Sequence, residues 1–580
     1  MIKSLQYLSI ALLLTFFSSS LSAQTVLGGE VHGSFEIDGQ LYKSDNSLGI
    51  TSESLNGKKA GFNGFGNLTY TLGNFTAGMR YEAFLPPLNG FSNNYEGSGI
   101  ANWYADYKND LLQITVGNFY EQFGSGLTLR SYEEWALGYD NSLRGLRLKL
   151  TPFKGVTIKA LVGYHREYWK EYTANSRGLV KGADVEFSLN DLIPSFSESK
   201  TRITIGGSIV SKYEKPINKT LVIPGDTIIY KYDFPSNVAM GAGRININHG
   251  GWNFMSEYAY KANDPNATNN YIYKAGQALY STLSWSTKGF GIMGGFKRID
   301  NMGFKSRMTE TGQILDINFL PPLTKMHQYS FAMMYPFASQ PNGEMALQGQ
   351  VDFTIPKNSL LGGKYGTQIT LNYSRVTNID KQQVDDATAI DQTGTLGYKS
   401  DFFAFGGELY YSDLSVMIGK KLNHSLKGTL GVMLQEYNKN VMEGHKDEYD
   451  NVKSTIIIGD VTWRLNNRHA LRFENQWLFT KQDKGNWVAG TIEYTVSPNW
   501  FFAVQDEYNY GINDVSSDHS ATEGDLEKIH YYNLSAGFIK GNSRIAVSYG
   551  RQREGLLCVG GVCRQVPAAT GFTLTLTTSF

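Results

Sequence analysis

The two cysteines of this sequence, Cys558 and Cys563, are its most reactive side chains. They bracket a Gly-Gly turn before the last predicted strand, so they can reach the geometry of a disulfide. A zinc site would need further ligands that the neighbouring sequence does not supply. A redox-active pair would need nearby positive charge, which only Arg551, Arg553 and Arg564 offer. We therefore expect a local disulfide in the final external loop, with a redox-active pair as the alternative.

A glycine-rich, charged segment at residues 119–141 is the candidate for selecting solutes. Pores select solutes with rings of opposed charge, and here acids could face bases, two of them from the following strand, across a constriction. The candidate constriction residues are Glu121, Arg130, Glu133, Glu134, Arg144 and Arg147. The alternative, a solvated external loop, fits the same sequence equally well.

Catalytic chemistry finds little support in the sequence. The nine histidines are scattered, and none has a serine or carboxylate at a spacing typical of a catalytic site. The Gly124-Ser125-Gly126 stretch does not have the spacing of a nucleophile elbow. We expect no enzyme activity, no metal site and no cofactor.

In the strands that must position these residues, apolar and polar side chains alternate with a period of two. From residue 30 to 41, apolar or small side chains alternate with polar ones for about a dozen residues, near the length of a tilted membrane-spanning strand. The same alternation recurs at residues 75–83, 156–165, 183–189, 426–435 and 488–496. The polar faces predict a hydrated lumen wall. Its candidate lining residues are Glu30, His32, Glu36, Arg80, Glu82, Lys149, Lys159, Asp184, Glu186, Arg472 and Glu474.

The connections between these strands alternate in length. Short turns stand at residues 73–74, 108–110, 152–155, 248–251, 286–289, 466–468, 497–499 and 540–542. Long polar segments stand between them, at 43–58, 85–99, 121–141, 214–235, 300–326, 375–400, 438–453 and 511–528. Outer-membrane barrels have short periplasmic turns and long external loops, so the fold class is all-β, a single large transmembrane antiparallel barrel.

Both ends of the chain agree with export to the outer membrane. Residues 1–23 have the basic start, apolar stretch and small-residue end of a secretory signal peptide, which leaves residues 24–580 as the barrel. The last strand has a lipid-facing row and ends in an aromatic residue, which together predict an assembly signal. Its residues are Phe572, Leu574, Leu576 and Phe580.

The strand count is uncertain in one region. Counting from the front gives about 13 strands up to Ile299, and counting from the end gives about 10 back to Tyr365. Residues 329–335 and 343–353 both look like strands, which breaks the parity. We expect about 24 strands, with 22 to 26 as the range. Strand patterning starts close to the predicted cleavage site, which leaves no room for an N-terminal plug domain; any plug must come from inward-folded loops or a partner.

The bulk composition is compatible with this fold. The 36 Tyr, 32 Phe and 62 Gly suit half-buried strands and tight turns. A mean hydropathy of −0.30 does not conflict with membrane insertion, because only every second strand residue faces lipid. The formal net charge is zero, so we expect no nucleic-acid partner.

Three stretches resemble a known family. They are residues 553–564 (REGLLCVGGVCR), 120–127 (YEQFGSGL) and 340–344 (QPNGE). They are similar to a family of porin-like outer-membrane proteins of Bacteroidota whose function is not established. The resemblance implies the fold and the membrane, and it transfers no activity and no functional residue.

The leading functional hypothesis is an outer-membrane channel for small polar solutes. The alternative is a closed accessory or scaffold barrel of a secretion or surface-protein complex, whose external loops bind a protein partner. In either case we expect contact with outer-membrane lipid and with the barrel-assembly machinery. Barrel architecture alone does not choose between these functions.

The predicted location can be tested directly. The protein should fractionate with outer membranes, and its unheated form should migrate differently from its heated form on a gel because a closed barrel resists detergent unfolding. Recovery of the mature chain as a soluble periplasmic protein would contradict the predicted location.

Overall fold

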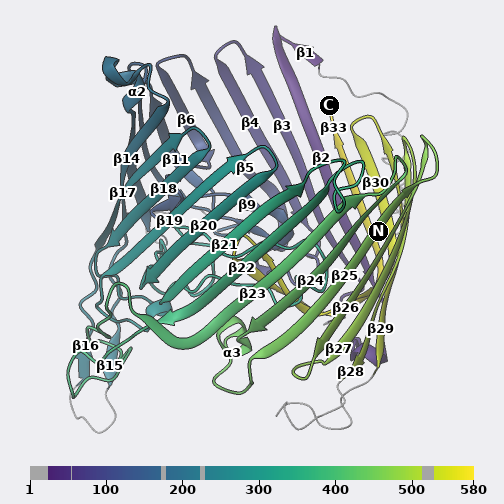
Figure 1. The fold of residues 1–580 in the computed structure, drawn as a ribbon. Helices are drawn as coiled ribbons and strands as arrows, with labels where there is room; N and C mark the ends of the chain where they lie inside the picture. Colours follow the sequence, from purple (N-terminus) through teal and green to yellow (C-terminus); the bar gives the residue numbers. More distant parts are fainter. Residues whose placement is uncertain (1–23, 54, 56, 171–177, 223–228, 512–527) are drawn as a thin grey trace.

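The structure is a computed structural model that describes residues 24–580 except 54, 56, 171–177, 223–228 and 512–527. The predicted signal peptide, residues 1–23, lies outside the described residues. Twenty-five strands form one antiparallel sheet, in which β1 (Gln24–Val26) pairs only with the start of β2. The other 24 strands close into a barrel (Figure 1).

The barrel strands follow one another around the wall in chain order. They are β2 (Gly29–Tyr42), β3 (Ala60–Leu72), β4 (Phe75–Phe84), β5 (Gly97–Lys108), β6 (Leu112–Phe119), β11 (Leu143–Leu150), β12 (Val156–His165), β13 (Leu179–Ser188), β14 (Thr201–Tyr213), β17 (Asn237–His249), β18 (Trp252–Lys261), β19 (Gly276–Thr287), β20 (Phe290–Asp300), β21 (Glu344–Ile355), β22 (Thr367–Ile379), β23 (Phe405–Lys421), β24 (Leu426–Tyr437), β25 (Val452–Arg464), β26 (His469–Thr480), β27 (Asn486–Val496), β28 (Trp500–Gly511), β29 (Ile529–Lys540), β30 (Ser543–Gln552) and β33 (Ala569–Ser579).

The connections hold only short elements. They are the strands β7 (Gln122–Phe123), β8 (Leu129–Arg130), β9 (Glu133–Glu134), β10 (Tyr139–Asp140), β15 (Thr220–Val222), β16 (Ile229–Lys231), β31 (Gly555–Val559) and β32 (Val562–Val566), the α-helices α2 (Leu189–Leu192) and α3 (Lys439–Glu443), and the 3₁₀ turns η1 (Asn46–Leu48), η2 (Asn93–Tyr95), η3 (Trp135–Leu137), η4 (Pro194–Phe196) and η5 (Ala267–Asn269). Among the described residues, no helix has the length and apolar character needed to cross a membrane.

The last strand closes the barrel against the first one. β33 pairs with β2 from Ser34↔Ser579 to Tyr42↔Gly571, and Phe580 exchanges backbone hydrogen bonds of 2.9 and 3.0 Å with Gly33. The Phe580 ring occupies the space that a side chain at Gly33 would need, since a Cβ there would lie 2.4 Å from the ring. The predicted terminal strand is therefore the closing strand.

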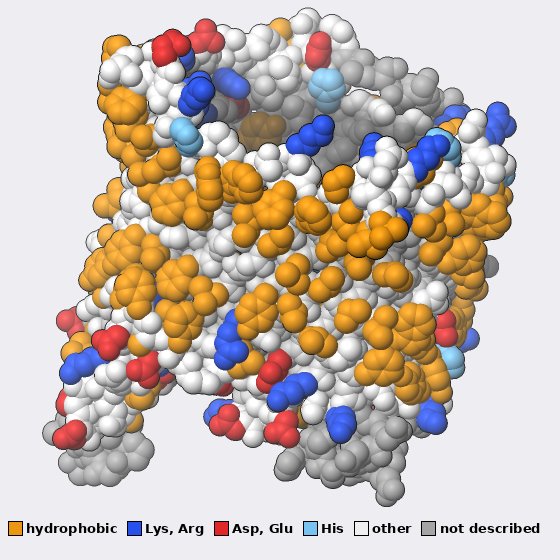
Figure 2. Space-filling model, viewed as in Figure 1, with side chains coloured by type: hydrophobic (Ala, Val, Ile, Leu, Met, Phe, Trp, Pro, Cys, Tyr) orange, Lys and Arg blue, Asp and Glu red, His pale blue; other side chains and the backbone are white. Residues whose placement is uncertain are grey.

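The two faces of the wall differ as the alternation predicts. Outward apolar side chains are exposed, for example Leu430 at 67% and Ile209 at 57%. Figure 2 shows them as a band of hydrophobic side chains around the barrel, with charged side chains gathered near its two ends. This band is where lipid would contact the protein.

The structure resolves the uncertain strand count. Residues 344–355 form β21, whereas residues 329–335 form buried turns and no strand. Of the two segments that look like strands, the second therefore crosses the wall and the first does not, and the total of 24 strands is confirmed. The reason is that residues 301–343, expected in part as an external loop, fold back against the inner faces of the wall strands.

Three connections fold inward in this way, and we call them the inner segments. They are the 120–142 segment, the 301–343 segment and the disulfide hairpin of residues 553–568, which contains β31 and β32. Side chains of the first two, such as Phe123, Phe304 and Phe331, are 0% exposed. The disulfide hairpin touches the 301–343 segment through a backbone hydrogen bond of 3.2 Å from Ser339 to Gly561.

The orientation of β30 yields a stability prediction. Val547 faces outward and is 45% exposed, whereas its neighbour Ser548 faces the lumen. Val547→Arg should destabilise the folded barrel by about 2–4 kcal/mol, because an arginine would face hydrocarbon. Ser548→Arg is the matched control and should cost much less. The measurement is the denaturant midpoint in lipid vesicles, and equal losses in the two variants would contradict the assigned faces.

Candidate functional site

Two buried arginines hold the 120–142 segment against the wall. Arg80 of β4 lies 2.7 Å from Glu82 and 2.6 Å from Asp140, and it also pairs with Glu133. Arg166, which follows β12, lies 2.6 Å from Glu82 and 2.6 Å from Asp140. We call this network the arginine latch. It joins the wall to β9 and β10, so it fixes the position of the segment.

The charge state of Asp140 follows from its place in the latch. Burial alone would raise the pKa of this carboxyl, but the Arg166 and Arg80 guanidiniums outweigh burial and hold the pKa below its usual value. A lowered folded-state pKa stabilises the structure at pH values above the ordinary carboxyl pKa. That stability is lost only as the pH falls through the folded-state value, so Asp140 is ionised at neutral pH.

All of the predicted constriction residues except Arg144 lie inside the barrel, but they make separate contacts. Glu121 accepts from Arg147 at 2.6 Å and from Lys159 at 2.7 Å. The Arg130 guanidinium lies between two rings, 4.4 Å from the centre of Tyr132 and 4.1 Å from that of Phe319.

The remaining constriction candidates make other contacts. Glu133 belongs to the latch, and Glu134 accepts from the Ala136 amide at the start of η3. No ring of opposed charges forms among these six described residues, and their role in selecting solutes stays a prediction.

Arg144 does not face the lumen. It shares the strand face of Leu146, which is 45% exposed on the outer wall. Its guanidinium lies 5.7 Å from the centre of the Trp103 ring and donates to Asn118 at 3.1 Å. The prediction of Arg144 as a constriction residue is therefore wrong, because the period of two places it outside.

The predicted lining residues all lie on the inner wall face, but in different surroundings. Arg80 and Glu82 are buried in the latch, Lys159 pairs with Glu121, and Asp184 and Glu186 bind Arg244. Arg472 pairs with Glu474 and lies 2.9 Å from Asp460. Glu30 and His32 are exposed near the short-turn end, and Glu36 and Lys149 are partly exposed. Whether they line a path for solutes is a prediction that their positions alone do not test.

The 301–343 segment joins two apolar clusters inside the barrel. In one, Phe304 and Ile317 pack with Phe123, Leu127 and inner side chains of β11 to β20. In the other, Tyr329, Phe331 and Tyr335 pack with inner side chains of β22 to β29. The segment therefore reaches across the lumen from one side of the wall to the other.

Buried lysines of the wall hold the backbone of this segment. Lys212, Lys261 and Lys297 donate to the carbonyls of Lys305, Gly303 and Pro321 at 2.9, 2.6 and 2.8 Å. A buried carbonyl needs a partner, and these lysines supply it. On the opposite side, Gln476 accepts from the Phe331 amide at 3.0 Å.

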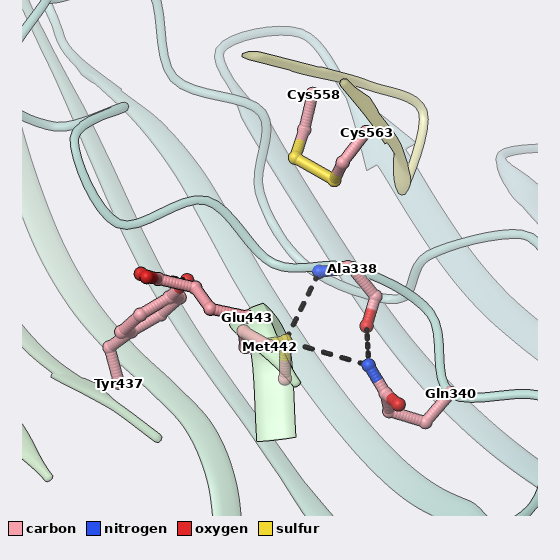
Figure 3. Close-up of a disulfide and its surroundings, with 7 residues drawn as sticks. All are labelled: Ala338, Gln340, Tyr437, Met442, Glu443, Cys558 and Cys563. Carbon is pink, nitrogen blue, oxygen red and sulfur yellow. Dashed lines mark hydrogen bonds between the residues drawn. A yellow bond between two sulfur atoms is a disulfide. The ribbon is translucent and has the colours of Figure 1, made fainter. Parts of the chain in front are cut away.

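The predicted disulfide is confirmed between Cys558 and Cys563. The hairpin that carries it does not project as an external loop, however. It folds inward and packs beside the other inner segments (Figure 3). Figure 3 also shows α3 of an external loop below the 301–343 segment, where the Met442 sulfur accepts from Ala338 and Gln340. External loops and inner segments thus form one packed body.

One arc of the wall carries a row of small or polar inner side chains. We call it the polar wall. It consists of the inner faces of β28, β29, β30, β33, β2 and β3 between the inner segments and the short-turn end. Its side chains are small or polar and partly exposed, namely Ser34, Glu36, Asp38, Asn67, Thr69, Gln505, Asn533, Ser535, Ala546, Ser548, Thr573 and Thr575. None of these described residues belongs to a buried apolar cluster. Figure 2 shows the short-turn end of the barrel as a hollow.

Sequence reasoning missed the latch partners Arg166 and Asp140 and the lysine anchors. The contact between Arg166 and Glu82 spans 84 residues, and no local pattern marks it. A usable signal was the run of aromatic and Met residues at 329–337 after two prolines, since it lacks the alternation of a lipid-facing strand. Among the described residues, no group of three or more His, Cys, Asp or Glu side chains could hold a metal ion.

A comparison with known protein families matches almost the whole chain to one of them. The profile of a family of unknown function, DUF6029, matches residues 3–580. The chain belongs to this family. A comparison with curated proteins finds no significant sequence match. The predicted origin in Bacteroidota stays a prediction.

Solved structures match the chain at low identity. A P pilus tip assembly intermediate of E. coli, PapC-PapD-PapK-PapG, is 10% identical, with a TM-score of 0.46 over 97% of this chain and 62% of the other. The P pilus usher PapC pore is 9% identical, with a TM-score of 0.41 over 95% and 99%. A mutant of the ferric enterobactin receptor PfeA of Pseudomonas aeruginosa is 11% identical, with a TM-score of 0.44 over 95% and 80%. This DUF6029 chain thus spans less than two thirds of the first of these chains.

The latch predicts the protease sensitivity of the 120–142 segment. Arg166→Met leaves Glu82 and Asp140 buried with one cation fewer, which should cost about 3–5 kcal/mol and release the segment. Trypsin should then cut after Arg130 in the folded, detergent-solubilised protein. Arg472→Met is the matched control, because the carboxylates that pair with Arg472 lie on the wall strands β25, β26 and β27. Unchanged resistance at Arg130 in the Arg166 variant would refute the latch role.

Proposed function

We propose that this DUF6029 protein is an outer-membrane channel that passes small polar solutes along the polar wall, beside its inner segments. The observation that carries the proposal is the lining of the polar wall. The inner side chains named above are small or hydrogen-bonding and partly exposed, and none of them belongs to a buried apolar cluster. Hydrated passages in barrels have this kind of lining.

Small side chains support passage in a second way. Ala546 and Ser548 of β30 lie opposite Thr575 and Thr573 of β33, so no bulky group projects from this part of the wall. The arginine latch lies elsewhere, on β4, after β12 and in the 120–142 segment.

A second candidate function is the closed accessory or scaffold barrel. The observation that favours it is the 301–343 segment, which spans the lumen and is buried between opposite parts of the wall. In that case the external loops would bind a protein partner and no solute would pass.

Single introduced thiols separate the two functions, because the chain has no free cysteine of its own among the described residues. Ser548→Cys and Ser535→Cys place a thiol on the polar wall, and a negatively charged thiosulfonate reagent should modify both. In a planar bilayer the parent protein should give discrete conductance steps. The modified variants should lose roughly half of the step size, because the adduct narrows a confined passage.

Ser208→Cys is the matched control for this experiment. Ser208 is also on the inner wall face, but it lies 3.1 Å from Thr128 under the 120–142 segment and is 9% exposed. Its thiol should stay unmodified. If the parent protein does not conduct, or if modification of the polar wall leaves conductance unchanged, the channel proposal fails and the scaffold function is favoured.

A further inference from the structure

One sector of the short-turn end of the barrel is strongly basic. It consists of the four successive turns between β19 and β26 with their flanking strand ends, at residues 287–289, 356–366, 420–427 and 464–469 (Figure 1). Together these segments contain eight Lys or Arg residues and no Asp or Glu. None of the eight side chains pairs with a carboxylate among the described residues. We call this sector the basic rim, and its charge favours an anionic partner.

A row of aromatic side chains on the outer wall marks the membrane surface beside the basic rim. Phe353 is 42% exposed on the outer wall and is paired in the sheet with Phe290. The Phe290 ring lies 6.4 Å from that of Phe353 and 5.7 Å from that of Trp285. Aromatic girdles in outer-membrane barrels lie at the level of the lipid headgroups. The basic rim begins just beyond this row, which places its cations at the depth of the lipid phosphates.

The 356–366 loop of the basic rim folds over the lipid-facing side of the wall. Lys420 shares the strand face of Ile418, which is 39% exposed on the outer wall. The Lys420 ammonium donates to the Leu361 carbonyl at 2.9 Å, which holds the loop on that side. Leu360 and Leu361 are 98% and 66% exposed. Their side chains continue the apolar outer surface, so lipid is the medium that would cover them.

Lysines flank this exposed leucine pair on both sides. Lys357 and Lys364 lie three residues before and three residues after the pair, and both are exposed. Lys364 and Lys421 lie over the Tyr365 ring, 5.8 and 4.9 Å from its centre. Lysine stems can follow an apolar surface while their ammonium groups reach a phosphate. Apolar side chains flanked by cations match an anionic amphiphile, because its acyl chains and its phosphate meet both features at once.

We propose that the 356–366 loop and the basic rim bind an anionic phospholipid of the periplasmic leaflet. Leu360 and Leu361 contact its acyl chains, and Lys357 and Lys364 neutralise its phosphate. The site lies on the outer wall, so it does not depend on the passage of solutes through the lumen. An acidic periplasmic protein is the other partner that this charge could attract, and the test separates the two.

Lipid preference can be measured on the full-length mature protein by native mass spectrometry in detergent. Dioleoyl phosphatidylglycerol is the anionic probe, dioleoyl phosphatidylcholine is the zwitterionic comparison, and the first should bind more tightly. A lysine near an anionic surface strengthens binding roughly fivefold, so the double variant Lys357→Gln, Lys364→Gln should bind phosphatidylglycerol roughly 25-fold more weakly. The matched control is Lys154→Gln, Lys200→Gln, which removes the same charge at the same end of the barrel, where Lys154 lies 2.8 Å from Asp191. It should leave binding unchanged.

A single introduced thiol tests whether the leucine pair lies in the bilayer, because the described residues include no free cysteine. A bimane label on Leu360→Cys should be quenched by phosphatidylglycerol with brominated acyl chains. The same label on Asn467→Cys, exposed in the 464–469 turn, should be quenched far less. Heat-modifiable migration shows that each variant is folded. Equal binding of the two lipids, or equal losses in the two double variants, would overturn the proposal. Absence of quenching at Leu360→Cys would also overturn it, in favour of an acidic protein partner.

Discussion

The structure depends on a single constraint, the closure of the sheet between β2 and β33. In hydrocarbon every backbone N–H and C=O must be paired within the protein, so a spanning sheet cannot keep a free edge. Here the register from Ser34↔Ser579 to Tyr42↔Gly571 removes the last edge, and Phe580 extends it over the side-chain-free Gly33. Strand number sets barrel width, so a closed ring of 24 strands creates a lumen too wide for wall side chains to fill.

Connections of the same chain fill much of that lumen. The buried charges of the wall are there because these connections need polar partners. A connection brought into the barrel carries backbone groups away from water, and each needs a partner. Lys212, Lys261 and Lys297 supply such partners to the 301–343 segment, and the arginine latch does the same with side-chain charge for the 120–142 segment. Much of the polar inner face is therefore an anchoring surface and not a hydrated wall.

Polar inner residues can either anchor an inner segment or line a hydrated lumen. The sequence alone could therefore predict which face they occupy, but not which of these two roles they have. Alternation identified the strands, their faces and their number, because lipid on one side imposes a strict period of two. It also placed Arg80 and Lys159 on the inner face correctly. It could not show that Arg80 is buried against Asp140, because that contact joins residues 60 positions apart. Residues 329–335 look like a strand in the sequence, because apolar side chains that pack inside a lumen resemble those that face lipid.

The same physics limits where a solute path could run. Where an inner segment is fixed by buried ion pairs and apolar clusters, moving it would leave charges unpaired, at a cost of several kcal/mol. The path that we propose therefore follows the polar wall, whose small or polar side chains named above lie outside the buried apolar clusters. Its external end is covered by the disulfide hairpin, whose short covalent loop keeps Gly555 and Leu556 beside Trp487. A path along this arc would need rearrangement of the hairpin and neighbouring side chains, while the latch and the lysine anchors stay in place.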